Sequence, residues 1–341
     1  MDLTDILITL AKIVIVFGIV LFTVAELVYT ERKISAWIQN RIGPNRVGWR
    51  GLLQPYADVI KLLLKEDIVP VAANRFIHTL APIISIVVAM STLAVVPFAG
   101  ASFTLFDREI TLVIADVNIG ILYILALTSM GVYGLTLSGW SSNNKYSLLG
   151  GLRSSAQMIS YELAMGLSVI GVVMVAGSLQ LTKIVEHQSG WMWNMVLQPV
   201  GFITFVVASF AETNRAPFDL PEAEPELVGG YHTEYSSFKF ALFFLAEYAN
   251  MITASAVITT LYLGGWQVPY LELLNLPVWA NVIAQLLAFV LKVAFMLFVF
   301  QWVRWTVPRF RYDQLMDLGW KVMLPIALAN VVVTAAVLLL M

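Results

Sequence analysis

The sequence contains no cysteine and only three histidines in 341 residues. Without cysteine, the chain forms no disulfide and holds no thiolate-bound metal or iron–sulfur cluster. His78, His187 and His232 form no spaced pair deep in an apolar segment, so a bis-histidine haem is not expected either. We therefore expect no metal site and no bound cofactor in this chain. Any electron transfer in which it takes part must use redox centres held by other proteins.

Charge is also scarce. Charged residues make up 12% of the chain and hydrophobic residues 59%, whereas a soluble domain carries about 25% charged residues. The net charge of −2 gives no sign of a nucleic-acid partner. The apolar residues form continuous runs and do not alternate, which favours membrane-spanning helices over a barrel. The sequence thus predicts an all-α polytopic membrane protein, with residues 1–341 forming a single membrane domain in the lipid bilayer.

About eight apolar runs are long enough to span a bilayer, by the criterion of roughly 20 residues. They start near Ile6, Ile77, Ile119, Ala156, Met195, Phe238, Val278 and Val322. The first run follows the acidic stretch "MDLTD" and has no small-residue cleavage site after it. We interpret it as a retained helix and not as a signal peptide.

Lysine and arginine lie mainly in the loops that follow odd-numbered runs. They are Arg32, Lys33, Arg41, Arg46, Arg50, Lys61, Lys65 and Arg75 after the first run, Lys145 and Arg153 after the third, Arg215 and Lys239 after the fifth, and Arg304, Arg309, Arg311 and Lys321 after the seventh. The loops on the other side hold only Arg108 and Lys183. The positive-inside rule therefore predicts that the polar loops are mainly cytoplasmic and that both termini face the opposite side.

The first polar loop, residues 29–76, contains a segment with helical periodicity, "LLQPYADVIKLLLKED". Its apolar and charged residues fall on different faces at steps of three and four, which predicts a cytoplasmic-side amphipathic helix in the interface plane. The helix either anchors the loop to the surface or lines a site. The preceding stretch "NRIGPNRVGWRG" is no phosphate loop, because no GK[ST] follows it; alone it is typical of a basic anchor with turns.

The other distinctive loop, residues 211–237, is acidic. Its first part, "AETNRAPFDLPEAEPELVGGYH", has one arginine, Arg215, against five carboxylates: Glu212, Asp219, Glu222, Glu224 and Glu226. The prolines at 217, 221 and 225 predict that this stretch is not a regular helix.

Three ionisable residues lie well inside apolar runs: Glu162, Glu247 and Lys292. Such groups are costly in a bilayer and are candidates for function. A carboxylate half-buried in a helix bundle has its pKa raised by burial, so it can exchange a proton near neutral pH. We therefore predict a polar relay that leads inward from the acidic loop. Lys292 is too deep to reach the surface and needs an acidic partner or a wet cavity; a purely structural ion pair with Glu247 is the alternative.

Several stretches together resemble one family of membrane subunits of NADH-quinone oxidoreductase, respiratory complex I: the bacterial counterparts of mitochondrial NADH dehydrogenase subunit 1. They occur in family order and cover nearly the whole chain. The matching motifs are "ERK", "GPNRVG", "LLQPYAD", "KLLLKED", "GWSSNNKYSLLGGLRSSAQMISYE", "AETNRAPFDLPEAEPELVGGYHTEYS", "FFLAEYANM" and "PRFRYDQLMDLGWK".

The resemblance implies a subunit of a proton-translocating enzyme in the bacterial cytoplasmic (inner) membrane, with both termini periplasmic. Quinone is the substrate, and the flavin and iron–sulfur clusters belong to partner subunits. Peripheral-arm quinone-site subunits and antiporter-like membrane subunits are the expected partners.

The resemblance also implies roles for single residues. The proton-coupling relay is expected to comprise Glu162, Glu212, Asp219, Glu222, Glu224, Glu226, Glu247 and Lys292. The quinone chamber and its entrance are expected to comprise Arg41, Arg46, Asp58, Arg215 and Phe218.

Two other functions fit parts of the pattern. Related hydrogenase-type complexes and ferredoxin- or plastoquinone-linked complexes carry relatives of this subunit, so a membrane anchor of such a complex is one alternative. A stand-alone secondary transporter is the other, although the sequence shows no internal repeat of the kind that such transporters often have.

Overall fold

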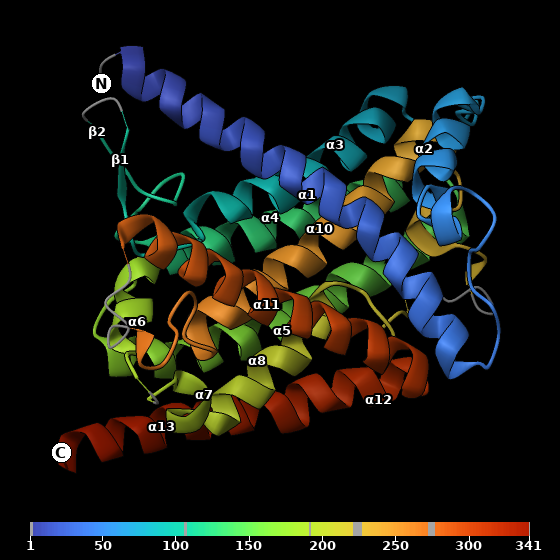
Figure 1. The fold of residues 1–341 in the computed structure, drawn as a ribbon. Coiled ribbons are helices and arrows are strands. Elements are labelled where there is room, and N and C mark those ends of the chain that lie inside the picture. The colour runs from blue at the N-terminus through green and yellow to red at the C-terminus, as the bar shows by residue number, and fades with distance from the viewer. Residues whose placement is uncertain (1–2, 106–107, 191, 221–226, 272–276, 341) are drawn as a thin grey trace.

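The computed structural model describes residues 3–105, 108–190, 192–220, 227–271 and 277–340, and long helices carry the fold (Figure 1). In the described residues, seven helical segments are long and apolar enough to cross a membrane. The helices of these segments are α1 (Leu3–Ile38), α3 (Arg75–Ser91), α4 (Gly120–Ser141), α5 (Lys145–Ala176), α10 (Ser237–Tyr262), α11 (Val278–Thr306) and α13 (Leu324–Leu340). The predicted class, an all-α polytopic membrane protein, is confirmed.

The run that starts near Met195 differs from the expectation of a full span. It folds as a single turn, α7 (Asn194–Leu197), followed by the 14-residue helix α8 (Pro199–Glu212). Pro199 occupies the first turn of α8, where its missing N–H costs nothing, but the chain at Gln198 is not helical. At 1.5 Å per residue α8 is about 21 Å long, shorter than the roughly 30 Å hydrocarbon core.

Short elements connect the long helices. They are η1 (Trp49–Gly51), α2 (Gln54–Leu64), η2 (Thr92–Val95), β1 (Phe103–Leu105), β2 (Arg108–Ile110), α6 (Leu181–His187), η3 (Gly230–His232), α12 (Tyr312–Asp317) and the π-helix η5 (Leu318–Met323). The strands β1 and β2 form an antiparallel hairpin in which Phe103 is opposite Ile110.

The two ends of α5 show how the sequence sets helix limits. The Asn144 side chain accepts from the backbone N–H of Tyr146 at 2.9 Å, which caps the N-terminus. Gly177 ends the helix in the left-handed conformation, with φ 65°, which glycine adopts without strain. The 32-residue helix between them runs through the centre of the protein.

The core lies where α5 and α10 pack against their neighbours α3, α4, α8 and α13. Close approach of α4 and α5 depends on glycine, since a Cβ at Gly139 would lie 2.5 Å from the Ser147 carbonyl oxygen. The helix α1 lies across the outside of this bundle, beside α10 and α11 (Figure 1). Most of its apolar residues in the first half are exposed, as suits a lipid-facing helix.

Both chain ends lie at one end of the bundle, and α2 lies at the other (Figure 1). The helix α2 is the predicted amphipathic segment, with Pro55 in its first turn. Val59, Ile60 and Leu63 on its apolar face are each more than half exposed. The placement of the α2 end in the cytoplasm remains a prediction from the lysine and arginine distribution.

Candidate functional site

The centre of the site is Arg215, which follows α8 in the acidic loop and is only 2% exposed. Its Nε lies 2.5 Å from Glu247 Oε1, and its Nη1 lies 3.3 Å from Glu31 Oε2. The guanidinium also lies over the Tyr248 ring, 4.2 Å from the ring centroid. A buried charge is stable only with such compensation, so α1 and α10 together hold this arginine in place.

A second arginine completes the group. Glu31 on α1 is 6% exposed, pairs with Arg304 on α11 and accepts from the Tyr248 hydroxyl at 2.9 Å. We call Glu31, Arg215, Glu247, Tyr248 and Arg304 the ion cluster. It contains two acids and two arginines, so its formal charge is zero.

Burial alone would lower the pKa of the Arg215 guanidinium. Glu247, Tyr248 and Glu31 outweigh that effect and raise this pKa above its ordinary value. Arg215 therefore stays charged at every physiological pH, and a change of charge in the ion cluster must occur on its acids.

Glu162 on α5 and Glu212 at the end of α8 form a separate acid pair. The two carboxylates are close enough to interact electrostatically. Glu162 accepts a hydrogen bond from the Ser129 hydroxyl, and Thr128 lies beside Glu212. Among the ion pairs of the described residues, none includes Glu162 or Glu212. Two carboxylates this close repel each other when both are charged.

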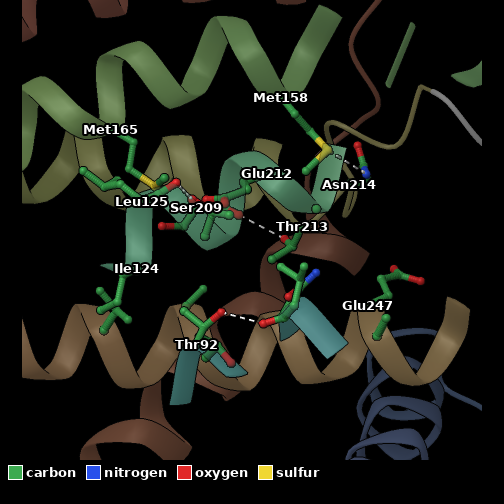
Figure 2. Close-up of a pocket in the computed structure, with 18 of the residues that line it drawn as sticks. Thr92, Ile124, Leu125, Met158, Met165, Ser209, Glu212, Thr213, Asn214 and Glu247 are labelled. Atoms are coloured by element: carbon green, nitrogen blue, oxygen red, sulfur yellow. Dashed lines mark hydrogen bonds between the residues drawn. The ribbon is translucent and has the colours of Figure 1, made fainter. Parts of the chain in front are cut away.

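A cavity of about 80 Å³ reaches one residue of the ion cluster, Glu247, and one of the acid pair, Glu212 (Figure 2). Glu212 on α8 and Glu247 on α10 both line it, and its walls come from α3, α4, α5, α8 and α10. Thr128, Asn250 and Thr253 add polar groups to the wall. One water needs roughly 10–15 Å³ of such space, so the cavity has room for several.

Residues 213–220 of the acidic loop, which include Pro217, are not helical. Asp219 pairs with Arg309 at 2.9 Å, and the Pro217 carbonyl accepts from the Phe310 N–H at 3.2 Å. Phe218 is buried against Tyr161 and Phe310. The predicted relay members Glu222, Glu224 and Glu226 lie outside the described residues, as do Pro221 and Pro225.

The structure does not bring the predicted entrance residues into contact with Arg215 or Phe218. Asp58 on α2 pairs with Arg32 at 2.7 Å and accepts from Gln54 at 3.1 Å.

Arg41 and Arg46 are exposed, and Arg41 donates to Gln39 and Ser35. Because Ser35 lies one turn after Glu31 on α1, the end of α1 links this loop to the ion cluster.

Lys292 on α11 lies elsewhere. Its Nζ donates to the carbonyl oxygens of Gly265, at 2.9 Å, and Gln267, at 2.7 Å, and lies 4.5 Å from the centroid of the Trp193 ring. These carbonyls follow the C-terminal end of α10, about four helical turns beyond Glu247. Lys292 is therefore placed away from the carboxylates, and the cation beside Glu247 is Arg215.

Glu31, Tyr248 and Arg304 are site residues that the sequence pattern did not predict. Glu31 belongs to the motif "ERK" near the end of the first apolar run, where a solvated helix end is the simplest interpretation. Its burial depends on how α10 and α11 pack against α1, which the local pattern does not show. Among the described residues, no group of three His, Asp or Glu side chains could hold a metal ion.

Comparison with known proteins identifies the family. Residues 11–335 match the family model described as NADH dehydrogenase. The chain is 56% identical over 331 residues to NADH-quinone oxidoreductase subunit 8 of Rhodothermus marinus, covering 94% of each chain. It is 56% identical to the NADH-quinone oxidoreductase H subunit of Salinibacter ruber, over 94% of this chain and 93% of that one. It is 55% identical to an H subunit of the same enzyme from Geobacter sulfurreducens, over 96% and 94%. The chain therefore belongs to the H subunit family of NADH-quinone oxidoreductase, as a membrane subunit of that enzyme complex.

Proposed function

We propose that this chain forms a wall of the quinone-binding chamber and couples quinone reduction to proton translocation through its buried carboxylates. The observation that carries the proposal is the position of Arg215. It bridges Glu31 and Glu247, and Glu247 lines a cavity that reaches Glu212.

Reduction of a quinone to a quinol takes up two electrons and two protons. The electrons come from iron–sulfur clusters and a flavin in the partner subunits. Negative charge formed in a low-dielectric chamber is costly until protons arrive. A chamber wall that holds exchangeable protons near the quinone therefore makes the reduction easier.

The ion cluster is the part of the chain that responds first. It is neutral as a whole, so added charge nearby alters the balance between Arg215 and its two carboxylates. Glu247 also lines the cavity, and a change in its protonation is felt through the cavity by Glu212. Because Glu212 and Glu162 interact as like charges, one of them then gains or releases a proton.

Quinone enters from the bilayer near α1 and α2, where Arg41, Arg46 and Asp58 lie. Asp219 and the acids at 222, 224 and 226 extend the path at its cytoplasmic mouth, and Phe218 and Arg215 belong to the chamber side of the loop. The proposal leaves Lys292 out of the path because of its position. The antiporter-like subunits receive the signal, and the peripheral-arm subunits cover the cytoplasmic face.

The test is the assembled complex carrying both Glu212→Gln and Glu247→Gln, reconstituted in proteoliposomes. Amide side chains keep the shape but hold no exchangeable proton. We expect quinone-dependent proton pumping to fall by about a hundredfold, the lower end of the range for removing a proton-transfer group. Full pumping by the assembled double variant would refute the coupling role.

A further inference from the structure

The side chain of Gln157 on α5 bonds to both ends of the turn that carries Arg215. Its Nε2 donates to the carbonyl oxygen of Ala211 at 2.8 Å and to that of Phe218 at 2.9 Å. The same Nε2 lies 3.2 Å from Asn214 Oδ1. Gln157 is fully buried and has no part in the ion cluster or the acid pair.

The orientation of the Gln157 amide follows from its neighbours. The two carbonyl oxygens accept hydrogen bonds only, and Asn214 Oδ1 accepts as well. The NH₂ group must therefore face them, because the opposite orientation would place oxygen against oxygen.

The turn between the two bonded carbonyls, residues 211–218, has little freedom of its own. Asn214 adopts a left-handed conformation with φ 49°, and the Phe218 N–H donates to the Arg215 carbonyl at 2.8 Å. Arg215 has only 2% of its surface exposed, so its side chain cannot reorient into solvent. The position of its guanidinium against Glu247 and Glu31 is thus set by where the turn is fixed.

We propose that Gln157 is a positioning residue that holds this turn so that Arg215 stays between Glu31 and Glu247. The inference rests on the proposed function, in which the balance between Arg215 and its carboxylates carries the coupling. Gln157 precedes Glu162 by five residues on α5, so one helix carries both the support for Arg215 and a member of the acid pair.

The charged and titratable groups that face Arg215 define the expected effect. They are Glu31 from α1 and Glu247 and Tyr248 from α10, with Arg304 from α11 facing Glu31. If the turn loosens, the carboxylates of Glu31 and Glu247 lose part of their electrostatic stabilisation by Arg215. Their ionised forms are then less favoured, and they stay protonated to higher pH.

The test uses Gln157→Met, which keeps the length of the side chain and removes the donor. Quinone reduction and proton pumping are measured against pH in proteoliposomes, per assembled complex. We expect pumping to fall about tenfold, the size expected when a buried donor of two hydrogen bonds is lost. We also expect the pH profile to move up by about one unit, the direction expected for Arg215→Gln as well.

Gln188→Met is the matched control. Gln188 is equally buried, and its Nε2 also donates to backbone carbonyls, those of Ile184 and Thr260, but it does not touch the 211–218 turn. We expect this variant to keep the wild-type pH profile. Gln157→Asn, which draws the amide back by about 1.5 Å, is measured in parallel in case Gln157→Met does not assemble, and it should shift the profile in the same direction.

An unchanged profile in the assembled Gln157 variants would overturn the inference, whether or not their total activity falls. The same holds if Gln188→Met shifts the profile equally. Failure of the proposed function gives a different result, because Glu212→Gln and Glu247→Gln would then pump normally. If the Gln157 variants keep the wild-type pH profile while the Glu212 and Glu247 variants are uncoupled, only the positioning role of Gln157 is refuted.

Discussion

Arg215 is a buried cation whose two carboxylate partners come from different helices, Glu31 from α1 and Glu247 from α10. The compensation of its charge therefore depends on tertiary packing and not on the loop in which Arg215 lies. The same packing brings Glu31 into contact with Arg215, Arg304 and Tyr248.

Replacing Glu31 with glutamine should destabilise the assembled complex by about 3 kcal/mol, the lower range for breaking a buried ion pair, because two arginines lose a shared partner. Thermal unfolding of the purified complex measures this. Glu26→Gln is the control on the same helix, since Glu26 takes part in none of the ion pairs of the described residues. Equal effects of the two substitutions would contradict the role of the ion cluster.

A substitution of Lys292 gives a second test on a single residue. Its ammonium group donates to the Gly265 and Gln267 carbonyls, so Lys292→Met should cost about 1–3 kcal/mol of stability through unpaired buried carbonyls. The number of protons pumped per electron should stay at the wild-type value in the complex that assembles. A lowered number of protons per electron would show that Lys292 takes part in the relay. Lys292→Arg, which keeps donors and charge, should recover most of the stability.

Much of the carboxylate set could be predicted from the sequence. An acid inside an apolar run stands out, and so Glu162 and Glu247 were found, with Glu212 from its place before the acidic loop. Glu31 and Arg304 could not be recognised in this way, because both lie near run ends where charge is ordinary. Only the packing of α1 against α10 and α11 buries Glu31 and brings Arg304 into contact with it.

Some of the helices could be predicted from the sequence, and the interruption before α8 could not. Apolar length predicted the spans, and the three-and-four spacing predicted α2. Hydrophobicity alone did not show that Gln198 and Pro199 interrupt the fifth run and leave α8 with 14 residues. Because α8 is short, it ends at Glu212 in the cavity wall. The acidic loop that follows therefore begins inside the bundle.

The loop before α2 and α2 itself carry the proposed quinone entrance, and this can be checked by photo-crosslinking. A photoreactive quinone analogue should label peptides containing Arg41 or Asp58 in the intact complex, and excess unlabelled quinone should compete. Peptides of the β1–β2 hairpin, at the other end of the bundle, serve as the internal control (Figure 1). No labelling above background at α2 would favour a membrane anchor without a quinone site.

The whole molecule places its functional groups asymmetrically. The ion cluster joins Arg215, at the start of the acidic loop, to α1, α10 and α11, and the cavity lies between α4, α8 and α10 with Glu212 and Glu247 in its wall (Figure 2). Around and beyond the carboxylates the cavity wall is largely apolar, with Ile124, Leu125 and Val257 among its residues. In the proposed function, this arrangement passes a change of charge from the quinone chamber into the membrane.

In the proposed function, quinone reduction changes the protonation of these buried carboxylates. Redox-induced infrared difference spectroscopy of the complete complex, with Glu212→Gln and Glu247→Gln beside the wild type, tests it most directly. We predict that quinone reduction produces a difference band of protonated carboxyl groups and that each substitution removes part of it, while Glu26→Gln leaves it intact. Identical difference bands in the wild type and in both variants would contradict the account.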